Sequence, residues 1–99
     1  MKLKAVTVYK RTNEGWKRYI FANAAVRFIA ATARKNGGDS ITSRAIVRIF
    51  SQNAAVIELG DRLVLDAVSD SAPDANALTV YEISDNTGLC RAHWRISAR

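Results

Sequence analysis

Cys90 and His93, three positions apart, are the residues whose types come nearest to catalytic or metal-binding chemistry. Each type occurs once in the 99 residues, so no Cys/His cluster can hold a zinc ion and no internal disulfide can form. On a strand, residues three apart point to opposite faces, which argues against a nucleophile and base pair. We therefore predict no catalytic residue, no metal, no cofactor and no enzymatic activity. Cys90 is expected to be a small buried side chain in a reducing compartment.

The aspartates and glycines fall where turns are expected. Asp is common in turns because its side chain hydrogen-bonds nearby backbone, and no EF-hand spacing is present. The aspartates concerned are Asp61, Asp66, Asp70, Asp74 and Asp85. Gly37 and Gly38 are not followed by the Lys-Ser or Lys-Thr of a phosphate-binding loop. Turn formation is the primary interpretation, and a carboxylate pair or a calcium site is the alternative.

Aromatic and basic residues alternate in the first third of the chain. Exposed rings beside cations form stacking platforms for single-stranded nucleic acid. The residues concerned are Tyr9, Trp16, Tyr19, Phe21 and Phe28, with Lys10, Arg11, Lys17, Arg18 and Arg27. Because the chain has eight aromatic residues, most of them are needed for a core, and we expect core packing to be their main role.

The net charge of +6 is divided unequally along the chain. Residues 1–50 hold eleven Lys or Arg and two acids, a net charge of +9, whereas residues 51–99 hold four Arg and seven acids, a net charge of −3. A basic surface suits nucleic acid through counterion release. It also suits self-assembly, in which the positive face of one copy docks on the negative face of the next. A solvated basic surface is the third interpretation.

Alternating apolar and polar residues predict an all-β chain. The expected strands are 2–10, 16–22, 44–50, 54–59, 63–65, 78–84 and 89–96, with a hairpin turn at 11–15. Gly60 and Asp61 form one further turn, and Asp85 to Gly88 another. Residues 66–77, which contain the single proline, form the longest loop, expected to be mobile and to project.

Residues 23–35 are ambiguous between helix and strand. Their alanines suit a helix with Asn23 as N-cap, whereas Val26, Phe28 and Ala30 alternate with polar or small residues and lead into a Gly-Gly loop. We predict a strand, because tertiary pairing often overrides alanine content. The expected fold is a single domain over 1–99, a small SH3-like or related antiparallel β-barrel with projecting loops. No apolar run approaches the roughly 20 residues of a membrane helix, and no signal peptide is expected, so we predict a soluble cytoplasmic chain.

Three segments in order carry a family resemblance. They are the strand AIVRIF at 45–50, the turn and apolar run GDRLVL at 60–65, and YEISDNTGLCRAHWRI at 81–96. Over roughly 41–97 the chain resembles the small neck proteins of tailed bacteriophages, the head–tail connectors. The resemblance implies a head-closure or stopper protein of the virion, made in the bacterial cytoplasm. Such proteins form a homo-oligomeric ring between portal or adaptor and tail, and retain packaged DNA.

The resemblance also directs attention to loops that a ring would repeat around its channel. The candidate interface and channel residues are Arg34, Lys35, Asn36, Gly37, Gly38, Arg44, Arg48, Asp70 and Asp74. Either the basic 34–38 loop lies near DNA, or the acidic segment 69–76 faces the channel and repels DNA while the basic loop contacts a neighbouring ring. The alternatives are a tail terminator or tail-completion protein, and a monomeric nucleic-acid-binding module.

Overall fold

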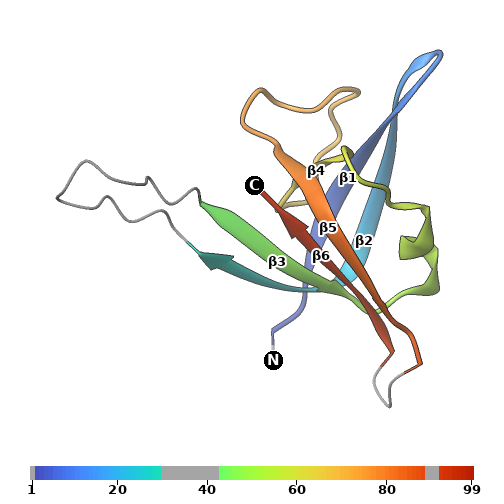
Figure 1. Ribbon diagram of the computed structural model, residues 1–99. Helices are drawn as coiled ribbons and strands as arrows, with labels where there is room; N and C mark the ends of the chain where they lie inside the picture. The colour runs from blue at the N-terminus through green and yellow to red at the C-terminus, as the bar shows by residue number, and fades with distance from the viewer. Residues whose placement is uncertain (1, 30–42, 89–91) are drawn as a thin grey trace, which may run out of the picture.

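The chain folds as a closed antiparallel β-barrel (Figure 1). The computed structural model describes residues 2–29, 43–88 and 92–99. Its elements are β1 (Lys4–Thr12), β2 (Gly15–Ile29), β3 (Arg44–Ile49), the 3₁₀ helix η1 (Gln52–Val56), β4 (Arg62–Val64), β5 (Leu78–Asn86) and β6 (His93–Ala98). The strands follow the order β1-β2-β3-β6-β5-β4, and β4 pairs with β1 to close the barrel. The predicted small all-β barrel is confirmed.

The long strand β2 resolves the ambiguous segment. It runs from Gly15 to Ile29 without interruption, so the strand prediction is confirmed as far as Ile29, and Asn23 is not a helix N-cap. The first half of β2 pairs with β1, and its second half pairs with β3 in the register Ala24↔Ile49 to Ile29↔Arg44. The backbone bonds of this ladder outweigh the helix preference of alanine, which amounts to a few tenths of a kcal/mol per residue. Residues 30–35 lie outside the described residues.

Small and β-branched side chains fill the barrel. The core consists of Val6, Val8, Phe21, Ala24, Ala45, Val47, Ile49, Ala54, Ile57, Leu63, Val80, Ile96 and Ala98. Ala45 on β3 lies directly opposite Ala98 on β6, and both are fully buried. Narrow barrels need small side chains at such positions so that the larger ones can meet across the interior.

The predicted strand at 54–59 is wrong, because the segment forms η1 instead. Ser51 caps the helix, since its hydroxyl accepts a hydrogen bond from the backbone N–H of Asn53 at 3.2 Å. Ala54 and Ile57, three positions apart, are both buried. A spacing of three is the repeat of a 3₁₀ turn, whereas a strand buries every second residue. The segment therefore closes one end of the barrel instead of adding a strand.

The predicted turn at Gly60 and Asp61 is present, and of the turn predicted at Asp85 to Gly88 the residues Thr87 and Gly88 are in a turn. Gly60 has a φ of +91°, a conformation that glycine adopts readily and other residues resist. In the second turn the Asp85 carboxylate accepts hydrogen bonds from the Thr87 hydroxyl at 2.6 Å and the Thr87 backbone N–H at 3.0 Å. These bonds lower the pKa of Asp85 below its ordinary value of 3.8. Strand β5 extends into this turn as far as Asn86, and Gly88 follows it.

The loop at 66–77 does not simply project, because its first part lies across the outside of β1. The Thr7 hydroxyl donates to the carbonyl of Asp66 at 2.6 Å and accepts from the Val68 N–H at 3.1 Å. The Tyr9 hydroxyl donates to the carbonyl of Asp70 at 2.9 Å. Thr7 and Tyr9 alternate with the core residues of β1 and are still fully buried, because this loop covers them.

Candidate functional site

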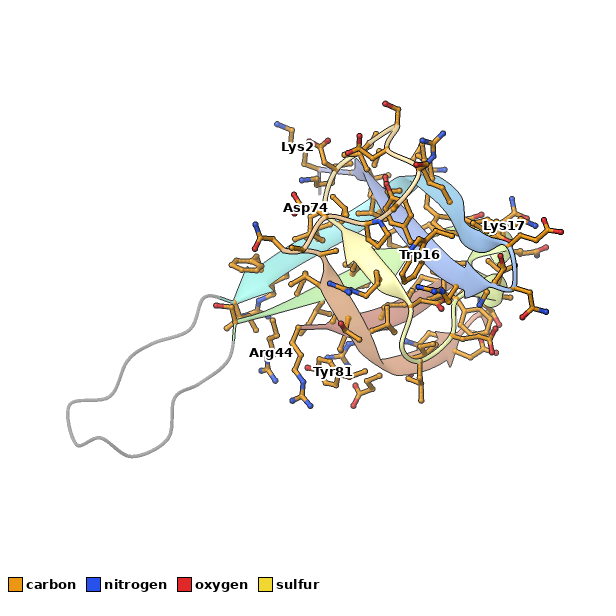
Figure 2. All side chains as sticks on the ribbon, turned by 90° about the horizontal axis from the view of Figure 1, so that it is seen from above. Lys2, Trp16, Lys17, Arg44, Asp74 and Tyr81 are labelled. Carbon is orange, nitrogen blue, oxygen red and sulfur yellow. The ribbon has the colours of Figure 1, made fainter. Side chains whose placement is uncertain are left out.

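Strand β3 places its arginines on the outside of the barrel. Ala45, Val47 and Ile49 are fully buried, whereas Arg44 and Arg48 are exposed. This is the alternation that the sequence predicts for a half-buried strand. In Figure 2 the side chain of Arg44, the first residue of β3, extends away from the barrel.

The register of the neighbouring strands adds further cations to this outer face. Arg48 lies directly opposite Arg95 of β6, and Ala25 of β2 lies on its other side. Arg27 of β2 lies opposite Ile46. Like charges placed opposite each other destabilise a sheet. The same register nevertheless places Val47 opposite Ile96 in the core, so packing inside the barrel determines the arrangement outside it.

These cations line a groove of about 640 Å³, which we call the basic groove. Lys2, Arg27, Arg48 and Arg95 supply its charge, and its remaining lining residues are Ala25, Val26, Ile46, Asn86 and His93. None of these described lining residues is acidic. Within residues 2–29, 43–88 and 92–99 none of the four cations forms an ion pair. The groove therefore presents four uncompensated positive charges around an apolar floor.

Two acids of β5 lie near this face in the strand register, Asp85 in the pair next to Ser84↔Arg95, and Glu82. Glu82 lies on β5 opposite Ser97, two pairs away from the Ser84↔Arg95 pair. Among the described residues it forms no ion pair. His93 is half-buried at the edge of the groove, with Nε2 3.2 Å from the Asn86 side-chain nitrogen and its ring centroid 5.6 Å from that of Phe50. The histidine is therefore held by neighbouring side chains in a packing role.

Lys10 differs from the groove cations because it is fully matched by acids. Its ammonium lies 2.6 Å from a carboxylate oxygen of Glu58 and 3.3 Å from one of Asp61. Burial lowers the pKa of Lys10, but its hydrogen bonds and charge interactions with Glu58 and Asp61 outweigh this and raise the pKa above 10.5. The hydrogen bond from Lys10, together with its charge, lowers the pKa of Glu58. Asp61, predicted as a turn residue, is thus also part of an ion-pair cluster.

Three aspartates lie in the segment 66–76, which we call the acidic loop. The side chains of Asp66, Asp70 and Asp74 are exposed and form no ion pair within the described part of the chain. Asp74 accepts a hydrogen bond from the Asn76 N–H at 3.2 Å, so it also shapes the loop. In Figure 1 the loop between β4 and β5 lies at the top of the barrel, and the N-terminal segment that contributes Lys2 lies at the bottom.

The remaining sequence candidates do not form a site among the described residues. Arg34, Lys35, Asn36, Gly37 and Gly38 lie outside those residues, as does Cys90. In the described ranges no group of three or more His, Cys, Asp or Glu could hold a metal ion. No helix in those ranges is long and apolar enough to cross a membrane.

The aromatic residues do not form one exposed platform. Tyr9 and Phe21 are buried, and Tyr19 packs against the core. Trp16, at the β1–β2 hairpin, lies beneath the Arg11 guanidinium at 5.2 Å. Phe28 is 54% exposed at the far end of β2 and lines an apolar recess of about 300 Å³. The rings are therefore divided between the core and separate parts of the surface.

Sequence reasoning identified Arg44, Arg48, Asp70 and Asp74, but not the partners that surround them. It missed Lys2 and Arg95 of the basic groove, and it named Arg27 and Lys10 only as part of a possible stacking platform for nucleic acid. Alternation along β3 predicts which way Arg48 points. The pairing of Arg48 with Arg95 depends on the register between distant strands, for which the sequence contains no comparable signal.

Comparison with known proteins finds no matching family model, no similar curated protein and no similar solved structure. The function must therefore be inferred from the residues themselves.

Proposed function

We propose that this chain is a structural assembly protein whose copies associate head to tail into a ring. Its resemblance to head–tail connectors suggests where the ring acts: in a phage neck, between portal or adaptor and tail. There it would retain packaged DNA and offer a docking surface to the tail. In this role the chain contributes shape, charge and a rigid scaffold.

The observation that carries the proposal is the separation of unpaired charge on the surface. The basic groove holds four cations without an ion pair within the described residues, and the acidic loop holds three carboxylates without one. Unlike surface patches on one chain favour a heterologous contact, in which patch A of one copy meets patch B of the next. Repeated with a closing rotation, such a contact makes a ring, and repulsion between Arg48 and Arg95 is relieved when acids dock there.

A closed barrel is a suitable subunit for such a ring. Closure pairs β4 with both β1 and β5, which shortens the sheet edges through which copies could associate indiscriminately. Side-chain patches and loops then decide how copies meet. A ring also repeats every surface charge around its channel, so a few residues per copy build a strong field near DNA.

Electron microscopy and mass photometry of the purified chain test this proposal. At about 0.05 M salt we expect closed rings of uniform diameter, and at about 1 M salt, where charges are screened within roughly 3 Å, we expect single copies. A chain that stays monomeric at low salt at every protein concentration would contradict the proposal. Density in a virion reconstruction would distinguish a neck ring from a tail terminator.

A nucleic-acid-binding module is the second candidate, and the basic groove favours it. A phosphate backbone along the groove would meet Lys2, Arg27, Arg48 and Arg95. Binding that neutralises about four phosphates weakens steeply with salt, with a slope of log K against log salt near −3 to −4. A gel-shift titration at several salt concentrations measures this slope. Absence of binding at low salt removes this candidate.

A further inference from the structure

We propose that the basic groove of one copy is the seat for the acidic loop of the next copy. This inference rests on the proposed ring and names the two surfaces that form its interface. The ligand of the groove is thus a second copy of this chain, and the contact consists of carboxylates between guanidinium and ammonium groups.

The two surfaces complement each other in charge. The groove contributes Lys2, Arg27, Arg48 and Arg95, and the loop contributes Asp66, Asp70 and Asp74. Four positive and three negative charges nearly cancel when the surfaces meet. Neither set is neutralised by ion pairs within the described part of its own copy.

The surfaces also complement each other in polarity. The groove floor includes Ala25, Val26 and Ile46 between the cations. The loop carries Ala72 and Pro73 between Asp70 and Asp74. Apolar residues would therefore face the apolar floor while acids face the rim, an apolar centre with a charged border that is typical of protein interfaces.

The acidic loop is held in shape before it binds. Hydrogen bonds from Thr7 and Tyr9 fasten its first part to β1. At its other end, the Ala77 N–H donates to the carbonyl of Asp74 at 3.0 Å, and the Arg62 guanidinium donates to the carbonyl of Ala77 at 2.8 Å. Pro73 further restricts the backbone between these anchors. A preorganised loop loses little conformational entropy on docking, which favours association.

Within one copy the acidic loop lies against β1 and beside the recess at Phe28, and it forms no ion pair with the groove cations among the described residues. Figure 1 shows the β4–β5 loop at the top, and at the bottom the N-terminal segment and the parts of β2 and β3 near it. The complementary contact is therefore between copies, and its head-to-tail sense follows from the placement of the two surfaces.

A second copy as the partner accounts for both the basic groove and the acidic loop, whereas a nucleic acid accounts for the groove alone. A phosphate backbone would account for the cations of the groove and leave three unpaired carboxylates on the preorganised loop without a role. Docking between copies assigns a partner to both surfaces at once.

Paired charge reversals test this interface. The groove variant carries Arg48→Glu and Arg95→Glu, and the loop variant carries Asp70→Lys and Asp74→Lys. In either variant alone the exchanged side chains face like charge, while Lys2, Arg27 and Asp66 keep theirs, so we expect association at least about a hundredfold weaker than in the wild type. Light scattering gives the association constant. Circular dichroism and thermal unfolding verify that each variant folds.

The decisive sample is an equimolar mixture of the two variants. The lysines introduced in the loop variant face the glutamates introduced in the groove variant, and the groove variant's acidic loop fits the loop variant's basic groove. We therefore expect the mixture to assemble with the two chains alternating, although neither assembles alone. The matched control for the groove variant carries Arg11→Glu and Lys17→Glu. It makes the same change in net charge, but at the β1–β2 hairpin, and should leave assembly unchanged.

The outcomes separate this inference from the proposed function. If the wild type forms rings and both reversed variants do so equally well, the interface lies elsewhere and the inference is overturned while the ring proposal stands. If the groove variant loses DNA binding and the loop variant assembles normally, the groove binds nucleic acid and the inference is also overturned. A wild type that never associates would remove both proposals.

Discussion

Lys10 and Arg48 are both cations on strands of the barrel, but their surroundings differ. Lys10 is enclosed by Glu58 and Asp61, and its side chain is 18% exposed. Arg48 is exposed opposite another arginine. A cation matched within its own chain stabilises the fold, whereas unmatched cations side by side are free to bind an anionic partner. Lys10 therefore contributes to stability, and Arg48 contributes to assembly if the proposed ring forms.

Replacing Lys10 with methionine should destabilise the fold. Met preserves much of the length and bulk of the side chain but leaves Asp61, whose side chain is 10% exposed, without its cation. Asp61 still accepts the Glu58 backbone N–H at 2.8 Å, which limits the loss. We expect the free energy of unfolding to fall by about 1–2 kcal/mol, measured by urea denaturation at neutral pH. A loss below about 0.3 kcal/mol, typical of an exposed pair, would contradict this role for Lys10.

The effect of Lys10→Met should depend on pH in a defined direction. The pKa of Glu58 is lowered in the fold, so its contribution is complete above 4.5 and is lost as the pH falls through its lower folded value. The pKa of Lys10 is raised, so its contribution is complete below 10.5 and is lost as the pH rises through its higher folded value. The stability difference between wild type and variant should therefore be largest between these limits and shrink outside them. Denaturation curves at a series of pH values measure it.

At the scale of elements, the sequence predicted strands well where one face is buried and pairing is local. The β1–β2 hairpin follows from alternation and a turn with Gly15, whose φ is +118°. The segment at 54–59 was predicted wrongly, because an apolar run too short for a clear period suits a strand and a 3₁₀ turn equally. Its place at the barrel end, where Ala54 and Ile57 reach the core, is decided by tertiary packing.

The loop after β4 is the element where polar composition was a poor guide. Its composition predicts a projecting loop, whereas its first part covers β1 and buries Thr7 and Tyr9. A buried threonine in a strand is compatible with many partners, and the sequence does not show that a loop 59 positions away provides them. The acidic loop thus combines two roles, since it covers the barrel and presents carboxylates to solvent.

Thr7→Val tests the anchoring of this loop. Valine fits the same space but cannot bond the carbonyl of Asp66 or the N–H of Val68, which are then left without these partners. We expect a loss of about 1–3 kcal/mol in the free energy of unfolding. Faster hydrogen exchange at Val68 should accompany it, with the exchange of β3 amides as the reference. Unchanged exchange at Val68 would show that the hydroxyl does not hold the loop.

At the scale of the whole molecule, the sequence predicted a small closed barrel and an uneven charge. It did not predict where the charges would gather, because the groove combines the N-terminal segment with β2, β3 and β6. The barrel order, in which β3 pairs with β6, brings residues 47 positions apart into direct contact. The uneven distribution of charge along the sequence therefore becomes a basic groove on the surface only because of this strand order.

Zero-length crosslinking tests most directly whether the basic groove of one copy meets the acidic loop of another. A carbodiimide joins an amine to a carboxylate that is in contact with it. A mixture of ¹⁴N- and ¹⁵N-labelled chains distinguishes links between copies from links within one. The Lys10–Glu58 pair, 2.6 Å apart in one copy, is the internal control. We predict mixed-isotope links from Lys2 to Asp70 or Asp74. The Lys10–Glu58 link without any mixed-isotope link between Lys2 and the acidic loop would contradict the account.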